Sequence, residues 1–181
     1  IDEFINYFAA EFWMSPGDWL SNTNNVKGFR SNEGDGKFHF VMFDLDSAFD
    51  GGNQMTAIDG QNGNAHVVQK LWKNMMRNEQ CRKQFVDAFC LVGGSIFEPS
   101  RCEQIINELA DVAQPMMDLS GDGWRVRDTR NDLLGKLAGN GSRRTTSINN
   151  LRNYSRVSDM TKDGIDLTFS ANHSEARLLF N

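Results

Sequence analysis

The side chains of this sequence with the types and spacing of metal ligands are carboxylates and amides in its first fifty residues. A polar loop contains Asp18 and then the pair Asn24 and Asn25, and an apolar run later ends in Asp44 and Asp46. Carboxylate and amide carbonyl oxygens are hard ligands of the kind that Mg²⁺ prefers. These residues therefore predict a divalent metal site.

The order of these residues is that of phosphoryl-transfer enzymes built on the protein-kinase plan. In those enzymes a loop Asp accepts the proton of the attacking hydroxyl. An Asn nearby and an Asp after a hairpin hold the magnesium ions that bridge the nucleotide phosphates. The order Asp, Asn, hairpin and Asp therefore indicates phosphoryl transfer.

A β-hairpin is expected to bring the later carboxylates to this site. The run from Lys37 to Asp46 predicts a buried strand that ends in Asp44 and Asp46, and alternate strand positions would point both carboxylates the same way. The turn signal Gly34-Asp35-Gly36 and the short apolar piece Val26 to Phe29 precede it and complete the hairpin. The competing interpretation is an ordinary acidic strand end or turn cap, because Asp favours turns.

Most of the remaining chain has the i, i+3, i+4, i+7 apolar spacing of amphipathic helices. The helices are expected over residues 1–13, 65–76, 79–91, 98–116, 124–137 and 142–157. Gly93-Gly94 is expected to break the third of them, Pro115 to kink the fourth, and Ser142 to cap the last. Their apolar stripes are expected to face the core. Residues 47–64, rich in Gly, Asn, Asp and Gln, are expected to form a long surface loop.

Composition narrows the functional class. The chain has 181 residues, of which 39% are hydrophobic and 24% charged, and this composition is typical of a globular protein. Its net charge of -5 argues against nucleic acid as the partner, and no apolar run approaches the length of a membrane span.

Ile1 lies on an apolar helix face without a preceding cap, so we expect a longer chain upstream. Cys81, Cys90 and Cys102 lack metal-type spacing, which leaves either three buried thiols or one disulfide.

The sequence gives little support for nucleophilic catalysis. There is no Gly-x-Ser-x-Gly segment, and His39, His66 and His173 lie in unrelated contexts. Each histidine is interpreted as structural or as a surface residue. The short apolar runs 165–169 and 176–180 predict the first hairpin of a β-module that follows the helical part.

The motifs around the candidate site resemble the CotH (spore coat protein H) kinase family. They are Ile1-Asp2-Glu3-Phe4-Ile5-Asn6-Tyr7-Phe8, Gly17-Asp18-Trp19, Asn24-Asn25-Val26-Lys27, Phe29-Arg30, Asp35-Gly36-Lys37-Phe38 and Phe43-Asp44-Leu45-Asp46-Ser47-Ala48-Phe49. The helical part is also similar, around Asn78-Glu79 and Phe97-Glu98-Pro99-Ser100-Arg101. The resemblance covers most of the chain and is most specific in the first fifty residues.

The resemblance implies an atypical kinase that uses Mg²⁺ and ATP to phosphorylate protein Ser or Thr hydroxyls. Asp18 would be the catalytic residue. Asn25 and Asp44 would bind the metal with Asp46 in support, and Asn24 and Asn25 would contact the cofactor.

The resemblance also implies an α+β architecture: a mainly helical C-terminal lobe over residues 1–160, with the start of a β-rich module at 161–181. Relatives of this kind are secreted or located at the cell surface. Partners would be a protein substrate and other components of a surface assembly.

Three departures from the family pattern affect the expected site. The paired asparagines lie six and seven residues after Asp18, instead of four and five, so Asn22 is a rival for the metal-binding role. Phe43 stands where the family has Trp. The nucleotide-covering lobe, with its basic phosphate anchor, would precede Ile1, so we expect the stretch that begins there to be inactive by itself.

Two other hypotheses remain open on the sequence alone. The longer loop after Asp18 and the Asn-rich segment 47–64 also fit a surface protein that keeps the fold without the reaction. A Ca²⁺-binding module built on Asp44, Asp46 and Asp50 is the other, although the spacing lacks the Gly and the Glu of an EF-hand loop.

Overall fold

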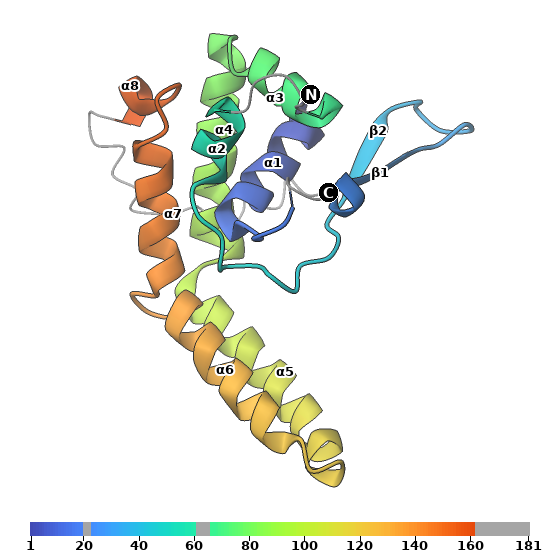
Figure 1. Ribbon diagram of the computed structural model, residues 1–181, viewed down its shortest axis with the longest axis vertical. Coiled ribbons are helices and arrows are strands. Elements are labelled where there is room, and N and C mark those ends of the chain that lie inside the picture. The colour runs from blue at the N-terminus through green and yellow to red at the C-terminus, as the bar shows by residue number, and fades with distance from the viewer. Residues whose placement is uncertain (20–22, 61–65, 162–181) are drawn as a thin grey trace.

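The computed structural model describes residues 1–19, 23–60 and 66–161 of the chain. In these residues the protein is mainly helical with one small antiparallel sheet, which confirms the α+β class (Figure 1). The elements are α1 (Asp2–Met14), a 3₁₀ turn (Thr23–Asn25), β1 (Lys27–Arg30), β2 (Phe38–Val41), α2 (Gln54–Gly60), α3 (Val67–Met75), α4 (Glu79–Leu91), a π-helical turn (Val92–Ile96), α5 (Pro99–Leu119), α6 (Gly123–Leu137), α7 (Ser142–Arg152) and α8 (Ser158–Thr161).

Helix α1 is the centre of the core. It contacts α4, β2, α7 and the π-helical turn, and nearly every side chain from Phe4 to Met14 is buried. The sequence suggested one apolar face, yet Ala10, Glu11 and Met14 on its other sides are buried as well. A helix covered in this way has neighbours all around it, so its position fixes theirs.

Aromatic rings connect α1 to the helices around it. The ring of Phe8 stacks on Trp72 of α3 with 4.9 Å between centroids, and Phe12 meets Phe85 of α4 edge-on at 6.0 Å. Each such pair contributes about 0.5–1.5 kcal/mol beyond the area that it buries. The helical stripes in α1 and α4 are therefore core faces, as predicted. Over residues 67–76 the prediction holds for Trp72 and Met76 but not for Val67 and Leu71, which are exposed.

The predicted strand over residues 37–46 is shorter than expected. β2 ends at Val41 and, among the described residues, pairs with β1, with Gly28 opposite Phe40. Met42, Phe43 and Asp44 follow it as exposed, non-strand residues, so the prediction of a buried strand that carries both carboxylates was wrong. The ribbon packs Phe40 against Phe4 and Tyr7 of α1, and no further strand of the described structure covers the rest of the run.

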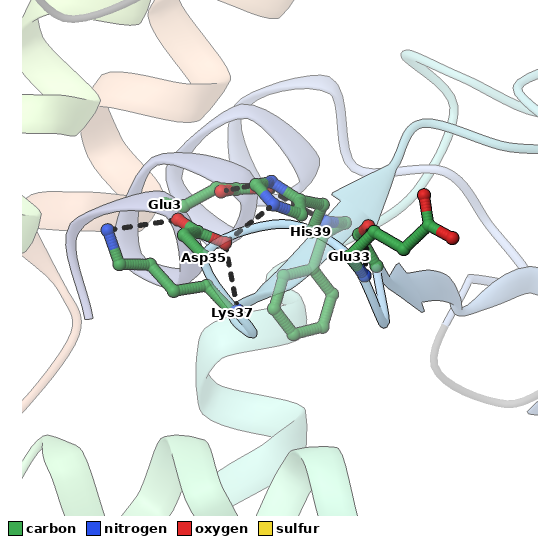
Figure 2. Close-up of polar contacts among 7 residues, drawn as sticks. Glu3, Glu33, Asp35, Lys37 and His39 are labelled. Carbon is green, nitrogen blue, oxygen red and sulfur yellow. Dashed lines mark hydrogen bonds and ion pairs between the residues drawn. The ribbon is translucent and has the colours of Figure 1, made fainter.

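The hairpin is fastened to the start of α1 by a small polar network (Figure 2). The Nδ1 atom of His39 lies 2.9 Å from Glu3, and its Nε2 atom lies 3.7 Å from Asp35. The second carboxylate oxygen of Glu3 accepts a hydrogen bond from the backbone N–H of Phe40 at 3.0 Å. The ring of Phe29 stacks on His39 from the neighbouring strand. The network fixes the hairpin on α1, in keeping with the structural role predicted for His39.

Two further predictions about the middle of the chain were wrong. The segment 47–64 contains α2, whose Met55 and Ile58 are buried, so it is not one long loop. Gly93-Gly94 does not break the third helix, because α4 runs directly into the π-helical turn. Both glycines are buried there, and the carbonyl oxygen of Gly93 accepts a hydrogen bond from Arg144 of α7 at 2.7 Å.

Helices α5 and α6 form a hairpin that extends away from the core (Figure 1). The sequence predicted that the apolar stripe of α5 faces the core, but this is true only of Ile106. Ile105, Leu109, Val112 and Met116 are exposed. α6 is the one helix that packs along α5 in the described structure, and a single neighbour covers only part of its apolar surface.

The sequence left open either three buried thiols or one disulfide, and it predicted that Ser142 caps α7. The described structure contains no disulfide, and of the three thiols only that of Cys102 is fully buried. Ser142 is the first residue of α7 rather than its cap, and α7 ends at Arg152. No helix among the described residues is long and apolar enough to span a membrane. Asn22 lies outside the described residues, and so does the β-module predicted over 161–181 from residue 162 on, including His173.

A carboxylate is buried in α1 without an ion-pair partner in the described structure. Glu11 is completely buried, and neither of its carboxylate oxygens accepts a hydrogen bond of normal geometry from the described residues. Burial raises the pKa of Glu11 to about 8, and the nearby Tyr7 hydroxyl opposes this to a smaller extent. The folded protein therefore holds a proton on Glu11 in a pH range where the unfolded chain has released it.

We predict that this proton makes stability pH-dependent. The pKa is about 8 in the folded protein against an ordinary value of 4.5. The free energy of unfolding should therefore decrease by about 1.4 kcal/mol per pH unit as the pH rises through this window, and level off above it. Urea unfolding at a series of pH values measures the slope.

The variant Glu11→Gln removes the titrating group and should flatten that part of the curve. Glu108→Gln, an exposed carboxylate on α5, is the matched control and should leave the slope unchanged. The same slope in Glu11→Gln as in the unsubstituted protein would exclude Glu11 as its origin.

Candidate functional site

Asp18, Asn25 and the segment after the hairpin meet through hydrogen bonds. The amide nitrogen Nδ2 of Asn25 donates to Oδ2 of Asp18 at 2.7 Å. The hydroxyl of Ser47 donates to Oδ1 of Asp18 at 2.8 Å. Asp18, Asn25 and Ser47 therefore lie together in the folded protein, whereas Ser47 was not among the predicted site residues.

Asp18 is positioned by the tryptophan that follows it. Trp19 is buried, and its indole N–H donates to the hydroxyl of Tyr7 at 2.8 Å. The indole also meets Phe8 and Phe12 of α1 edge-on, at 5.1 and 5.4 Å. The backbone at Asp18 is therefore fixed by a large side chain inserted beside α1.

Left-handed backbone conformations flank the site on both sides. Ser15, Asp44 and Phe49 are the non-glycine residues with positive φ in the described part of the chain, at 49°, 57° and 73°. Asp tolerates this conformation better than most residues, whereas a bulky residue such as Phe adopts it only under constraint. Such strained residues concentrate at ligand-binding and active sites, so their placement here supports a functional role for the segment.

The end of α1 and the segment that follows the hairpin are joined through their backbones. The N–H of Gly51 donates to the carbonyl oxygen of Ser15 at 2.9 Å, and the hydroxyl of Ser15 donates to the carbonyl oxygen of Gly52 at 2.7 Å. The N–H of Phe49 donates to the carbonyl oxygen of Met14 at 2.7 Å. A Cβ atom at Gly51 would collide with the carbonyl oxygen of Ser15, so glycine is required there.

A buried arginine from α7 completes this junction. The Nη1 of Arg143 donates to the carbonyl oxygen of Gly51 at 2.9 Å, and its Nε donates to Ser147 at 2.8 Å. The hydroxyl of Ser147 in turn donates to the carbonyl oxygen of Trp13 at 2.8 Å. Burial lowers the pKa of Arg143 from its ordinary value, against a smaller opposing effect of Asp50. Arg143 thus acts as a positioning residue between α7 and the site.

The predicted metal ligands differ in how the structure places them. Asn25 is buried beside Asp18, whereas Asn24 is exposed, so the structure selects Asn25 as the partner of Asp18. Asp44 and Asp46 are both exposed in the segment after β2. Since Nδ2 of Asn25 bonds to Asp18, the carbonyl oxygen Oδ1 is the atom with which Asn25 would bind a cation.

These donors fit a hard divalent cation by type, because the set is one amide oxygen and two carboxylates. Among residues 1–19, 23–60 and 66–161 there is no cluster of three or more His, Cys, Asp or Glu side chains placed to hold a metal ion. The magnesium ligand set of Asn25, Asp44 and Asp46 therefore stays a prediction.

Two open grooves adjoin the candidate site. The first, of about 580 Å³, lies between the segment Leu45–Asp50 and α6 and is lined by Asp46, Asp50, Asp128, Asp132 and Lys136 among others. The ammonium group of Lys136 lies 2.6 Å from Asp50 and 2.8 Å from Asp132, and these side-chain hydrogen bonds raise the pKa of Lys136.

The second groove, of about 890 Å³, lies between the hairpin, α1 and α3. Its lining is mainly apolar and includes Val26, which follows Asn25 directly in the chain. Asp18, Asn25 and Ser47 are not among the residues that line this groove.

The comparison with known families agrees with the motifs. The model of the CotH kinase protein family matches residues 1–158. The chain belongs to this family. No curated protein and no solved structure shows a significant match to it. Membership in the CotH kinase family therefore rests on most of the chain, including every residue of the candidate site.

Sequence reasoning missed the roles of Ser47, Arg143 and Ser147. Ser47 lies in the quoted CotH motif directly after Asp46, so its position was available although its contact with Asp18 was not. Arg143 and Ser147 carry no signal in the sequence, because they reach the site from a helix that follows about ninety residues later.

We predict that Arg143→Met loosens the junction around Gly51. The substitution keeps a long apolar stem but leaves the carbonyl oxygen of Gly51 without this donor, which should lower the free energy of unfolding by about 2 kcal/mol. Hydrogen exchange at the Gly51 amide should also become faster.

Arg144→Met is the matched control, because Arg144 is the next residue of α7 and donates to the carbonyl oxygen of Gly93 in the π-helical turn. It should leave exchange at Gly51 unchanged. Equal exchange at Gly51 in the two variants would contradict the role assigned to Arg143.

Proposed function

We propose that this protein catalyses phosphoryl transfer from Mg-ATP to Ser or Thr hydroxyls of proteins. The observation that carries the proposal is the hydrogen-bonded group of Asp18, Asn25 and Ser47, formed by segments separated in the sequence. Membership in the CotH kinase family gives the kind of reaction. A kinase of this type acts mainly by positioning its reactants and by stabilising charge, so a preorganised polar group is what the reaction requires.

In this proposal Asp18 holds the acceptor hydroxyl and takes its proton. Its two oxygens accept hydrogen bonds from Asn25 and Ser47, which fix the orientation of the carboxylate. A base that is fixed within hydrogen-bonding distance of a hydroxyl contributes about 10²–10⁴-fold to a rate.

The carbonyl oxygen of Asn25 and the carboxylate of Asp44 would hold Mg²⁺, with Asp46 in support and Asn24 at the exposed edge of the loop. The metal held by these residues would supply positive charge that offsets the charge of the ATP phosphates. The left-handed backbone at Asp44 turns the chain directly after the hairpin, which brings the following Ser47 to Asp18.

The proposal concerns the full-length protein. Kinases need a basic residue that anchors the nucleotide phosphates, and we propose that a lobe outside these residues supplies it. We further propose a location outside the cell or at its surface, where protein substrates with exposed Ser or Thr would be presented.

A second candidate function is that of a surface protein that keeps this fold without the reaction. The observation that favours it is the closed hydrogen bonding at Asp18, since both carboxylate oxygens already accept bonds from the protein's own side chains. Such a group can be a structural unit that joins the loop to the hairpin.

Substitution in the full-length protein tests the proposed reaction. Asp18→Asn and Asp44→Asn should each lower phosphate transfer by about 10²-fold or more, while the protein stays folded. Asn is chosen at position 44 because it accepts the left-handed conformation of Asp44. Transfer of radiolabelled γ-phosphate to a Ser-containing protein acceptor is the measurement.

Asp87→Asn is the matched control, because it removes an exposed carboxylate from α4, away from the site. It should transfer phosphate at the unsubstituted rate. Full transfer activity in both Asp18→Asn and Asp44→Asn would refute the proposed roles.

Nucleotide binding separates the two candidate functions. A kinase should be stabilised by Mg-ATP, because a ligand that binds only the folded state raises the melting temperature. At a concentration of about 100 times Kd the gain is about 2.7 kcal/mol. The absence of a shift in the full-length protein at millimolar Mg-ATP would favour the surface protein without activity.

A further inference from the structure

The hydroxyl of Ser47 contacts Asp18 in the way that an acceptor hydroxyl contacts a general base. It donates to Oδ1 of Asp18 at 2.8 Å. A general base holds the group that it deprotonates at about 2.6–3.2 Å. The side chain next to the proposed base is thus a serine hydroxyl, which is the same chemical group as the proposed substrate.

The surroundings of this hydroxyl are complementary to any alcohol. The backbone N–H of Gly17 donates to Oγ of Ser47 at 3.1 Å and also lies 3.2 Å from the carbonyl oxygen of Ser47. A hydroxyl has one hydrogen and two lone pairs. The carboxylate of Asp18 takes the hydrogen and the N–H takes one lone pair, so the second lone pair stays available for a bond to phosphorus. The same donor and acceptor fit the hydroxyl of a bound substrate.

The two oxygens of Asp18 differ in access. Oδ2 accepts from Asn25, whose exposed fraction is only 2%. Oδ1 accepts from Ser47, which is half-buried like Asp18 itself, and the neighbouring Gly17 is exposed. A protein substrate can therefore approach Oδ1, while Asn25 keeps hold of Oδ2.

The segment around Ser47 is anchored without the Ser47 hydroxyl. The backbone N–H groups of Phe49 and Gly51 donate to carbonyl oxygens at the end of α1, at 2.7 and 2.9 Å. Arg143 of α7 donates to the carbonyl oxygen of Gly51 at 2.9 Å. No atom of the Ser47 side chain takes part in these bonds. The hydroxyl can therefore rotate away from Asp18 while the segment stays against α1.

We propose that Ser47 occupies the acceptor position at Asp18 and is displaced by the hydroxyl of a protein substrate. This role rests on the phosphoryl transfer proposed above, in which Asp18 is the base. Before the substrate binds, the Ser47 hydroxyl keeps water away from Oδ1 of Asp18. The substrate hydroxyl then takes over the contacts with Gly17 and Asp18, and the Ser47 hydroxyl turns toward solvent.

The consequence is a preference for protein hydroxyls over water. In both reactions the acceptor oxygen forms a bond to the γ-phosphorus of ATP, and the bond from this phosphorus to the β,γ-bridging oxygen breaks. ADP leaves, and Asp18 takes the proton of the acceptor. A substrate held elsewhere on the protein presents its hydroxyl at a high effective concentration and can displace Ser47. Water has no such anchor and competes poorly with a hydroxyl of the protein itself.

Removal of the hydroxyl from the full-length protein tests this role. Ser47→Ala should raise the hydrolysis of Mg-ATP without an acceptor by about tenfold, because water then reaches Oδ1 of Asp18. The acceptor concentration at half-maximal transfer should decrease by about the same factor, since no hydroxyl has to be displaced. The acceptor is a pool of synthetic peptides with one central Ser, and the same pool with Ala is the blank. Release and transfer of labelled γ-phosphate are measured.

Three further variants control the experiment. Ser47→Thr keeps a hydroxyl and should behave like the unsubstituted protein, whereas Ser47→Gly should behave like Ser47→Ala. Ser120→Ala is the matched control, because the exposed Ser120 donates to the carbonyl oxygen of Met117 at the end of α5. It should change neither hydrolysis nor transfer. Thermal melting measures the folding of each variant.

Four results would overturn the role of Ser47. Hydrolysis and transfer that fall by the same factor in Ser47→Ala would show that the hydroxyl only aligns Asp18. Unchanged hydrolysis and an unchanged half-maximal concentration would show that it does not occupy the acceptor position. Unfolding of both Ser47→Ala and Ser47→Gly would make it a structural link. Labelled phosphate on Ser47 would make it an acceptor that is not displaced.

Failure of the proposed function has a different signature. The unsubstituted full-length protein would then neither transfer phosphate to the Ser peptides nor hydrolyse Mg-ATP, and Ser47→Ala would not hydrolyse it either. That result would refute the phosphoryl transfer and the role of Ser47 together. Each of the four results above leaves phosphoryl transfer by the unsubstituted protein intact.

Discussion

The burial of α1 on every side is the constraint on which the candidate site depends. Its aromatic side chains contact α3 and α4, and Trp13 stacks on Phe97 after the π-helical turn at 4.2 Å. The chain leaves this helix through the left-handed Ser15 and enters the core again at Trp19. Asp18 lies between these two fixed points. Core packing, rather than the exposed hairpin, therefore sets the position of the proposed catalytic residue.

The segment after the hairpin is held against α1 by hydrogen bonds as well as by the partly buried side chains of Leu45, Ala48 and Phe49. Backbone bonds from Gly51 and Phe49 reach the last residues of α1, and Arg143 adds a charged donor from a distant helix. Buried hydrogen bonds restrict the backbone to one geometry. A donor or acceptor that moves out of place is left unpaired, which costs about 1–3 kcal/mol. This explains how the strained backbone at Asp44 and Phe49 persists.

The described structure places the segment that contains Ser47 next to α6. Asp46 and Ala48, on either side of Ser47, line the groove between this segment and α6. The α5–α6 hairpin projects away from the core (Figure 1), and Leu109, Val112, Met116 and Leu119 of α5 are exposed. α6 therefore borders the candidate site, whereas these exposed apolar residues lie on α5.

The sequence by itself determined most of the helices and named Asp18 and Asn25, which are in contact in the folded protein. Apolar spacing located α4 and α6 almost to the residue, and Pro99 after Glu98 marked the start of α5, because these signals act within one or two helical turns. The tertiary structure decided where β2 ends, which asparagine bonds to Asp18, and how Arg143 reaches Gly51. It also decided that the stripe of α5 is exposed while that of α1 is buried. An amphipathic pattern shows that a face is apolar, but only the packing of distant segments determines what covers it.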